Sequence, residues 1–438
     1  MYREKTTTNE ETQRMKVSRQ SIVLAITFVL VFFMTGPVEP VPAQSGFEGY
    51  LESSFSARGS DDGPIRDRNL LEETRLLIEK DFYGRSGESL NVGVLATTDP
   101  DRNQSEIELR EGSVFLPLSR SVELRAGRQI LSWGPSQFEF INDHFAKDYR
   151  SFFLGRDLDF LKAPNDAVKL SFYNDLANMD LVVNPSFEPD RLPSGDMIPV
   201  YDPSVGRLVR YHPDGDTPAR PRRPESSMDN GEVHLRVHRM VGRWETALYG
   251  YRGFSGQPSA FNGNRPYYPE LASAGFSLRG PMMGGVLWAE GSYDDIRHDQ
   301  AGDSPYLPPS RSNLGIGMRY RTSPTVNYMV QAISSWQMDA AGYRDALPAD
   351  HPDADRVRHR LQVATTRNYW SDRLTVELRG FAGLTEEDWH ARLQNTYDYS
   401  DAVTLSSGFL LYGADQPTSR FGALDEHDLA FVRLRYGF

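Results

Sequence analysis

The last ten residues, Leu429-Ala-Phe-Val-Arg-Leu-Arg-Tyr-Gly-Phe438, alternate between apolar and cationic side chains. Counting back from the C-terminus, one face carries Ala430, Val432, Leu434, Tyr436 and Phe438, whereas Arg433 and Arg435 share the other face. Side chains alternate faces along a strand, so this segment predicts a strand that is apolar on one side and doubly cationic on the other. A soluble sheet could bury the apolar side. The aromatic end favours instead the last strand of a transmembrane β-barrel, which faces lipid outside and water inside.

The N-terminus carries the pattern of a secretory signal peptide. Basic residues Arg14, Lys16 and Arg19 precede an apolar run over residues 22–34, and the small residues that suit cleavage follow at Val41-Pro-Ala43. The apolar run is too short to span a bilayer comfortably as a helix. We therefore expect residues 1–43 to be removed, with Met15 as an alternative start, and the mature chain to comprise residues 44–438.

Composition narrows the class of protein. No segment after residue 43 is long and apolar enough for a transmembrane helix, and only helices and closed barrels satisfy every backbone group in lipid. The chain has 48 basic and 60 acidic residues, of which residues 1–43 hold five and four, so the mature chain has 43 and 56 and a net charge of −13. This acidic balance argues against nucleic acid as a partner. The absence of cysteine excludes disulfides and thiol-ligated metals.

The mature chain reads as a series of alternating segments of about ten residues separated by turns. We predict an all-β fold, a transmembrane antiparallel up-and-down β-barrel of 18 strands, with 16 as the alternative. Short turns separate some strands and long polar loops separate others, the asymmetry that outer-membrane barrels show between their periplasmic and extracellular ends. The predicted strands are 46–56, 69–82, 88–98, 104–116, 119–131, 166–174, 178–184, 231–240, 243–254, 271–280, 284–294, 311–322, 325–337, 356–370, 373–384, 388–399, 402–413 and 427–438.

Charged side chains gather on the face opposite the apolar one. At the bilayer midplane each would cost about 2–4 kcal/mol on the lipid side, so we expect them to face a watery lumen, which excludes an apolar filling of the interior. They could form cross-strand ladders or an arginine cluster that sets selectivity, and the sequence leaves both interpretations open. The predicted pore-lining residues are Glu106, Glu108, Arg110, Glu123, Arg125, Arg236, Arg356, Arg358, Arg360, Glu377, Arg379, Arg433 and Arg435.

Two segments are too long for simple turns. The segment 185–230 is rich in proline and carries the basic patch Arg220-Pro-Arg-Arg223, so we expect an extracellular loop. The segment 132–165 is rich in aromatic residues that need burial, and we expect it to fold inward and narrow the pore. The alternative is that it packs on the outer rim or against lipopolysaccharide. Its candidate constriction residues are Trp133, Phe138, Phe140, Tyr149, Arg150 and Arg156.

Two short stretches resemble known barrel families. Arg125-Ala-Gly-Arg-Gln-Ile-Leu-Ser-Trp-Gly134 resembles the Gly-Arg-Gln…Ser-Trp-Gly stretch of a porin-like outer-membrane barrel family of uncharacterised function, some members of which accompany RND-type exporters. A similar Gly-Arg-Gln strand occurs in alginate-export barrels, and a Trp-Gly-Pro in capsule-assembly barrels. The end at Tyr436 and Phe438 resembles the C-terminal signature that the outer-membrane insertion machinery reads. The resemblances imply contact with outer-membrane lipids, lipopolysaccharide and that machinery, and make an inner-membrane exporter a further candidate partner.

The sequence carries no signature of an enzyme. The motifs HExxH, GxSxG and the P-loop are missing, and His234 and His238 would lie ~13 Å apart on a strand, too far for one metal. We expect no cofactor, no metal and no catalytic residue. The expected function is a porin-like channel of the Gram-negative outer membrane, or the outer-membrane component of an export route, that passes solutes through a charged aqueous lumen. The alternative is a non-transporting surface barrel that binds polysaccharide or a partner and serves envelope assembly.

Overall fold

The computed structural model describes residues 46–58, 69–100, 103–193, 195, 198, 200–202, 207–209, 220–262, 265–296, 307–338, 340–346, 356–425 and 427–438. The predicted signal segment 1–43 lies outside the described residues. None of the described helices is long and apolar enough to cross a membrane.

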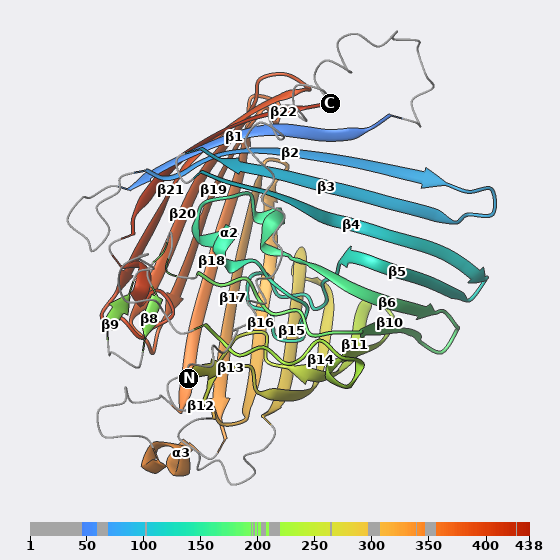
Figure 1. The fold of residues 1–438 in the computed structure, drawn as a ribbon, viewed down its shortest axis with the longest axis vertical. Coiled ribbons are helices and arrows are strands. Elements are labelled where there is room, and N and C mark those ends of the chain that lie inside the picture. Colours follow the sequence, from blue (N-terminus) through green and yellow to red (C-terminus); the bar gives the residue numbers. More distant parts are fainter. Residues whose placement is uncertain are drawn as a thin grey trace, which may run out of the picture.

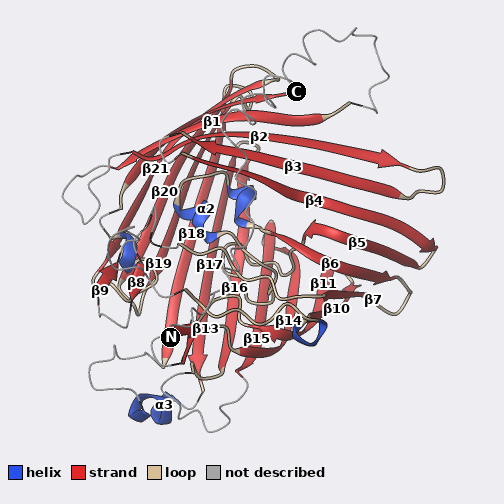
Figure 2. Ribbon diagram, viewed as in Figure 1, coloured by secondary structure: helices blue, strands red, loops and turns tan. Residues whose placement is uncertain are grey.

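Eighteen antiparallel strands form one closed barrel (Figures 1 and 2). The last strand pairs with the first, and the backbone groups of Gly49 and Phe438 exchange hydrogen bonds of 3.1 and 3.0 Å. The predicted barrel of 18 strands is therefore confirmed and the alternative of 16 is wrong. The strands are β1 (Glu48–Arg58), β2 (Asn69–Tyr83), β3 (Ser89–Asp99), β4 (Gln104–Ser119), β5 (Val122–Ile130), β6 (Pro164–Phe172), β7 (Asn178–Asn184), β10 (Glu232–Val241), β11 (Trp244–Phe254), β14 (Glu270–Met282), β15 (Gly285–Ile296), β16 (Arg311–Ser323), β17 (Val326–Gln337), β18 (Val357–Tyr369), β19 (Leu374–Gly383), β20 (Asp388–Asp398), β21 (Val403–Ala414) and β22 (Leu429–Gly437).

The two ends of the barrel differ in their connections. Tight turns join β10 to β11, β14 to β15 and β16 to β17 at the end where β1 begins and β22 finishes, which we call the short-turn end. Most connections at the other end are long, although β19 and β20 are joined there by residues 384–387 alone. These connections carry the small elements β8 (Val200–Asp202), β9 (Arg207–Val209), β12 (Ala260–Asn262), β13 (Arg265–Tyr267), α3 (Ala340–Ala346), η2 (Met228–Asn230) and η3 (Gly422–Leu424).

The two faces of β22 differ in burial as its sequence predicts. Val432, Leu434 and Tyr436 expose 49, 52 and 53% of their surface, whereas Phe431 and Arg433 on the opposite face expose 3% each. An apolar face that stays exposed along a barrel wall is what contact with lipid requires, because lipid rather than protein then covers it.

A β-bulge in β4 changes which residues face inward. Leu109 pairs with Val94 and Glu111 pairs with Gly93, which leaves Arg110 between them without a partner on β3. Arg110 is buried while Leu109 is exposed, and beyond the bulge the odd-numbered Ser113 is the buried residue. One extra residue in a strand reverses which of the following residues face inward, and the alternation in the sequence does not reveal this shift.

The exposed aromatic end generates a prediction about assembly. Phe438→Asp should lower the amount of heat-modifiable barrel in the outer membrane without reducing export to the periplasm, because it removes the aromatic end of the closing strand. Phe438→Tyr, which keeps the ring, should assemble normally. Gel mobility of unheated and heated membrane fractions measures this, and normal levels of heat-modifiable Phe438→Asp protein would contradict it.

Candidate functional site

The stretch Gly-Arg-Gln…Ser-Trp-Gly builds the corner at which the chain leaves the barrel wall after β5. Gly127 has φ +121°, and a Cβ there would collide with the carbonyl oxygen of Gly112 on β4, so glycine is required. The Arg128 guanidinium holds the Leu109 carbonyl at 2.7 Å and Asp166 at 3.0 Å. Gln129 is fully buried and its side-chain amide donates to the Ala167 carbonyl at 3.0 Å. The stretch therefore ties β5 to both of its neighbours immediately before the corner.

The second half of the stretch directs the chain into the interior. The Ser132 hydroxyl donates to Asp143 at 2.8 Å, and the Trp133 ring packs edge-on against Phe145 at 5.1 Å between centroids. Gly134 has φ +81°, and a Cβ there would lie 2.9 Å from a carboxylate oxygen of Glu290 on β15. Glycine is thus needed here both for its backbone conformation and for close approach to the opposite wall.

The connection between β5 and β6, residues 131–163, lies inside the barrel, and we call it the inner segment. It contains α2 (Tyr149–Phe153) and η1 (Leu158–Leu161), and Figure 1 shows α2 within the ring of strands. Its contacts reach strands on every side of the ring, which a segment on the outer rim could not do. Contacting strands include β2 through Glu73, β4 through Arg110, β10 through His234, β15 through Glu290, β17 through Gln331, β18 through Arg360 and β20 through Arg392.

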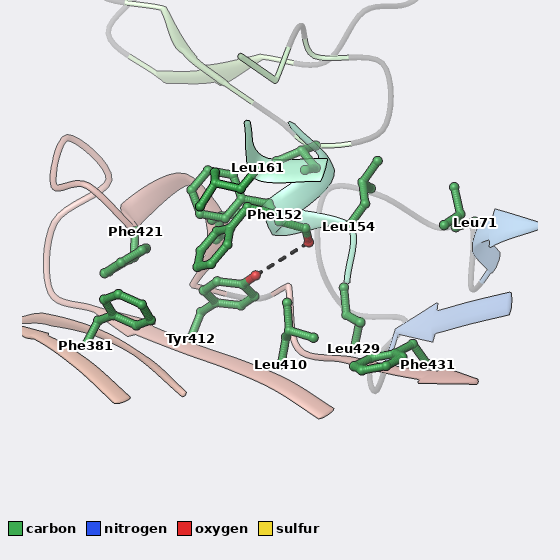
Figure 3. Close-up of a cluster of buried hydrophobic side chains, with 13 residues drawn as sticks. Leu71, Phe152, Leu154, Leu161, Phe381, Leu410, Tyr412, Phe421, Leu429 and Phe431 are labelled. Atoms are coloured by element: carbon green, nitrogen blue, oxygen red, sulfur yellow. Dashed lines mark hydrogen bonds between the residues drawn. The ribbon is translucent and has the colours of Figure 1, made fainter. Parts of the chain in front are cut away.

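Apolar side chains hold one side of the inner segment. Figure 3 shows Phe152, Leu154 and Leu161 packed against residues from β21, β22 and the connection between them. The Tyr412 hydroxyl also donates to the Phe153 carbonyl at 3.5 Å. The partners of the inner segment in this cluster are Leu71, Ile198, Phe381, Leu410, Tyr412, Phe421, Leu424, Leu429 and Phe431.

This cluster corrects one expectation. The charged inner face led us to exclude an apolar filling of the interior, and that is wrong for the sector lined by β19–β22. At the end with the long connections, the inward positions of β19, β21 and β22 are apolar, for example Phe381, Leu410 and Phe431. Both faces of these three strands are apolar there, so alternation alone does not identify the lumen side.

Ion pairs hold the rest of the inner segment. The fully buried Glu139 carboxylate pairs with Arg360 of β18 at 3.3 Å and with Arg420 from the connection between β21 and β22. Burial raises the pKa of Glu139, but the two guanidinium groups outweigh it, and the net pKa is lowered. Asp157, which caps η1, pairs with Arg435 at 3.1 Å and Arg433 at 3.7 Å.

The wall opposite contributes a third set of polar anchors. Glu290 accepts hydrogen bonds from the Ser136 backbone at 3.1 Å and from the Asn142 amide at 3.0 Å, and no described Lys or Arg forms an ion pair with it. On the side of the apolar cluster, the Arg156 side chain pairs with Glu73 of β2, and the Arg156 carbonyl accepts from Arg392 of β20 at 2.9 Å. Breaking a buried pair costs about 3–5 kcal/mol because the remaining charge is left uncompensated, so these contacts fix the segment in place.

The predicted site residues divide into two groups. The first group contacts the inner segment, and Arg360, Arg433 and Arg435 do so through the ion pairs described above. Arg110 donates to the carbonyls of Asp159 and Lys162. The Arg379 guanidinium lies 4.0 Å from the centre of the Phe138 ring. Of the predicted constriction residues, Trp133 and Arg156 are buried, and Phe138, Phe140 and Tyr149 pack at the edge of the apolar cluster. The Arg150 backbone N–H donates to the Arg191 carbonyl, which docks the start of the 185–230 connection onto the inner segment.

The second group pairs along the wall or lies apart. Arg236 pairs with Glu245, Arg125 with Glu111 at 3.9 Å, Arg358 with Glu386 at 3.5 Å, Glu377 with Arg379 at 2.7 Å, and Glu108 with Arg191. Glu123 accepts from the Tyr173 hydroxyl at 2.8 Å. Glu106 is exposed, and Arg356 precedes the first residue of β18.

Sequence reasoning missed several residues that anchor the inner segment or the wall behind it. Glu290 was overlooked although Trp288, Glu290, Ser292 and Asp294 alternate along β15, a pattern that could have identified it. Glu52 of β1 and Arg75 of β2 form another buried ion pair. They were missed because a single charge in an alternating strand carries no sign of its partner.

The inner segment leaves space beside it. A cavity of about 420 Å³ lies between the segment and strands β14–β16, and one of about 340 Å³ lies between it and strands β4–β6, with Ser132 on the border of both. Charged residues line both cavities: Arg279, Arg319 and Lys162 the first, and Glu123, Arg125 and Lys169 the second. In the described part of the chain, no cluster of three or more His, Asp or Glu side chains could hold a metal ion.

Comparison with known proteins shows the fold. No protein-family model matches the chain, and no curated protein matches it. Solved structures do match. OccK2 (OpdF) of Pseudomonas aeruginosa, solved in complex with glucuronate, is 12% identical over 90% of this chain and 98% of its own, with a TM-score of 0.54. OccAB4 of Acinetobacter baumannii is 10% identical over 91% of this chain and 100% of its own, with a TM-score of 0.53. OccAB3 of the same organism is 9% identical over 90% and 99%, with a TM-score of 0.52. These proteins are outer-membrane porins, and their likeness to this chain is one of architecture.

The ion pairs of Glu139 with Arg360 and Arg420 lead to a prediction about the inner segment. Glu139→Gln should increase hydrogen exchange in peptides from residues 132–165 and 415–428, because Arg360 and Arg420 lose their shared carboxylate, at a cost of about 3–5 kcal/mol. Glu387→Gln, which neutralises an exposed carboxyl between β19 and β20, serves as the matched control and should leave both segments protected.

Acidification should remove the difference in hydrogen exchange between the Glu139→Gln variant and the parent chain. Because the folded-state pKa of Glu139 is depressed, its stabilisation is present above the unfolded pKa of about 4.3 and is lost as the pH falls through the lower folded value. Exchange that is equal in both proteins at neutral pH would show that Glu139 does not hold the segment.

Proposed function

We propose that the chain forms a porin-like channel in the Gram-negative outer membrane and that small solutes pass through its charged aqueous lumen. One observation carries the proposal: a long connection is fixed inside a closed 18-stranded barrel by ion pairs, and cavities with charged walls remain beside it. Porin barrels of 16–18 strands are wide enough to leave an aqueous channel. The architecture shared with outer-membrane porins supports the same assignment.

In this proposal the short turns face the periplasm, the long connections face the outside, and the apolar outer face contacts lipid and lipopolysaccharide. The insertion machinery would read the end at Tyr436 and Phe438, after export directed by a signal peptide at 1–43. The export role that the 125–134 resemblance implies has no counterpart among the described contacts, so the proposal is limited to passive passage.

We assign the lumen wall to the predicted pore-lining residues and the constriction to the inner segment. Most of these arginines have an acidic partner within 4 Å, for example Arg360, Arg435 and Arg236. The pairing favours a role in holding the wall and the inner segment together over a free arginine cluster. The non-transporting alternative requires a lumen that excludes ions, so conductance distinguishes the two.

Cysteine labelling tests the assignment of the wall. Cysteine at 358 should react with a water-soluble maleimide, because we assign Arg358 to the lumen side of β18, whereas cysteine at 363 should be protected, because we assign the exposed Val363 to the lipid side. Labelling of intact outer membranes, read by mass shift, measures both. The reverse pattern would place the register one residue off and turn every side chain to the other face.

Removal of the inner segment tests the constriction. Deleting residues 136–160 and joining the ends with a short glycine linker should raise single-channel conductance in planar bilayers, since the segment occupies the interior. The deletion also exposes Phe381 and Phe431, so heat-modifiability must first show that the barrel has assembled. Unchanged conductance from an assembled deletion variant would refute a constriction role, and the absence of conductance from both proteins would refute the channel.

A further inference from the structure

The cavity of about 420 Å³ beside the inner segment has an excess of unpaired positive charge. Arg279 of β14, Arg319 of β16 and Lys162 of the inner segment line it, against the single carboxylate of Asp159. Within the described part of the chain, none of these four side chains has an ion pair within 4 Å or a side-chain hydrogen bond. Most other inward arginines have an ion pair or a side-chain hydrogen bond. Arg279 and Arg319 are also exposed to solvent rather than buried, so a ligand could reach them.

The strand register places the two arginines around one indole ring. Arg279 lies opposite Trp288 on the neighbouring β15, and Arg319 lies opposite Val286 on the other side of β15. Trp288 and Val286 share a face of β15, so their side chains and the two guanidinium groups face the same cavity.

Aromatic rings form the apolar part of the wall. The Trp288 ring is 3% exposed, and its N–H donates to the Gln331 amide oxygen at 3.1 Å, which fixes the ring plane. Gly317 makes room for the ring, because a Cβ there would collide with the indole. Phe138 and Phe140 of the inner segment line the same cavity.

We propose that this cavity is a binding site for monoanions that carry an apolar ring. The anionic group lies between Arg279 and Arg319, whose guanidinium forks bond to paired oxygen atoms, and the ring packs against Trp288 and Phe138. A volume of about 420 Å³ lies within the range of small-molecule sites, which are mostly apolar with a few convergent polar groups. The inference rests on the proposed function, in which the site lies on the solute path at the short-turn end of the constriction.

Equilibrium binding to the full chain in detergent micelles tests the site without relying on conduction. Benzenesulfonate is the probe, methanesulfonate has its charge without the ring, and benzyl alcohol has the ring without the charge. Isothermal titration calorimetry should give benzenesulfonate an affinity at least about tenfold above either comparison compound, because each hydrogen bond to a charged group contributes about a factor of ten or more.

Variants then locate the binding. The double variant Arg279→Ala/Arg319→Ala should weaken benzenesulfonate binding at least about tenfold. Arg321→Ala is the matched control, since Arg321 lies on β16 two residues beyond Arg319, and its guanidinium bonds to the carbonyls of Ser323 and Pro324 outside the cavity. It should bind within about twofold of the parent chain. If the double variant does not assemble, the single changes Arg279→Gln and Arg319→Gln take its place.

Conductance of the same preparations separates the two proposals. A protein that conducts ions but binds all three compounds equally, or binds benzenesulfonate equally with and without the two arginines, overturns the site and leaves the channel standing. A protein that binds benzenesulfonate through these arginines but conducts nothing overturns the channel and leaves the site standing. The expected result is conduction together with a block by benzenesulfonate that the double variant weakens.

Discussion

Closure of the sheet by β1 and β22 is the constraint on which the rest of the structure depends. A strand in lipid has no water to satisfy its backbone, so both edges of the sheet must pair with each other. Once Gly49 and Phe438 exchange their hydrogen bonds, each wall residue faces either outward or inward. Apolar residues such as Val432 and Leu434 take the outer face, and the charges of the chain are confined to the interior and the ends. The acidic and basic side chains of the interior therefore form ion pairs with one another within a limited enclosed volume.

Eighteen strands enclose more space than the wall side chains fill, and the inner segment occupies part of it. It is held by different interactions on different sides. Apolar packing against β21 and β22 dominates one side, and the hydrogen bonds to Glu290 dominate the opposite wall. Ion pairs of Glu139 and Asp157 complete the attachment. Because charges and apolar groups both anchor the segment, neither salt nor a change of pH alone should release it from the interior.

Much of the fold could be predicted from the sequence because period-two alternation is a local property. All 18 strands lie where alternation places them, to within a few residues. The bulge at Arg110 could not be predicted, since it depends on how β4 pairs with β3. The contacts of the inner segment were also beyond reach: Glu139 meets Arg420 across 281 residues and Arg156 meets Glu73 across 83. The sequence around either partner does not indicate which distant residue it pairs with.

The distribution of charge inside the barrel follows from the same confinement. An arginine that is buried without an anion is costly, and the buried Arg75 has the carboxylates of Glu52 and Glu73 beside it and serves the structure. Arg279 and Arg319 differ because they are exposed and, among the described residues, have no ion pair within 4 Å. Groups of this second kind can bind an anion without breaking the barrel's own contacts. In the proposed channel, the exposed and unpaired cations of the wall, rather than its most buried ones, are therefore the groups that can bind a solute.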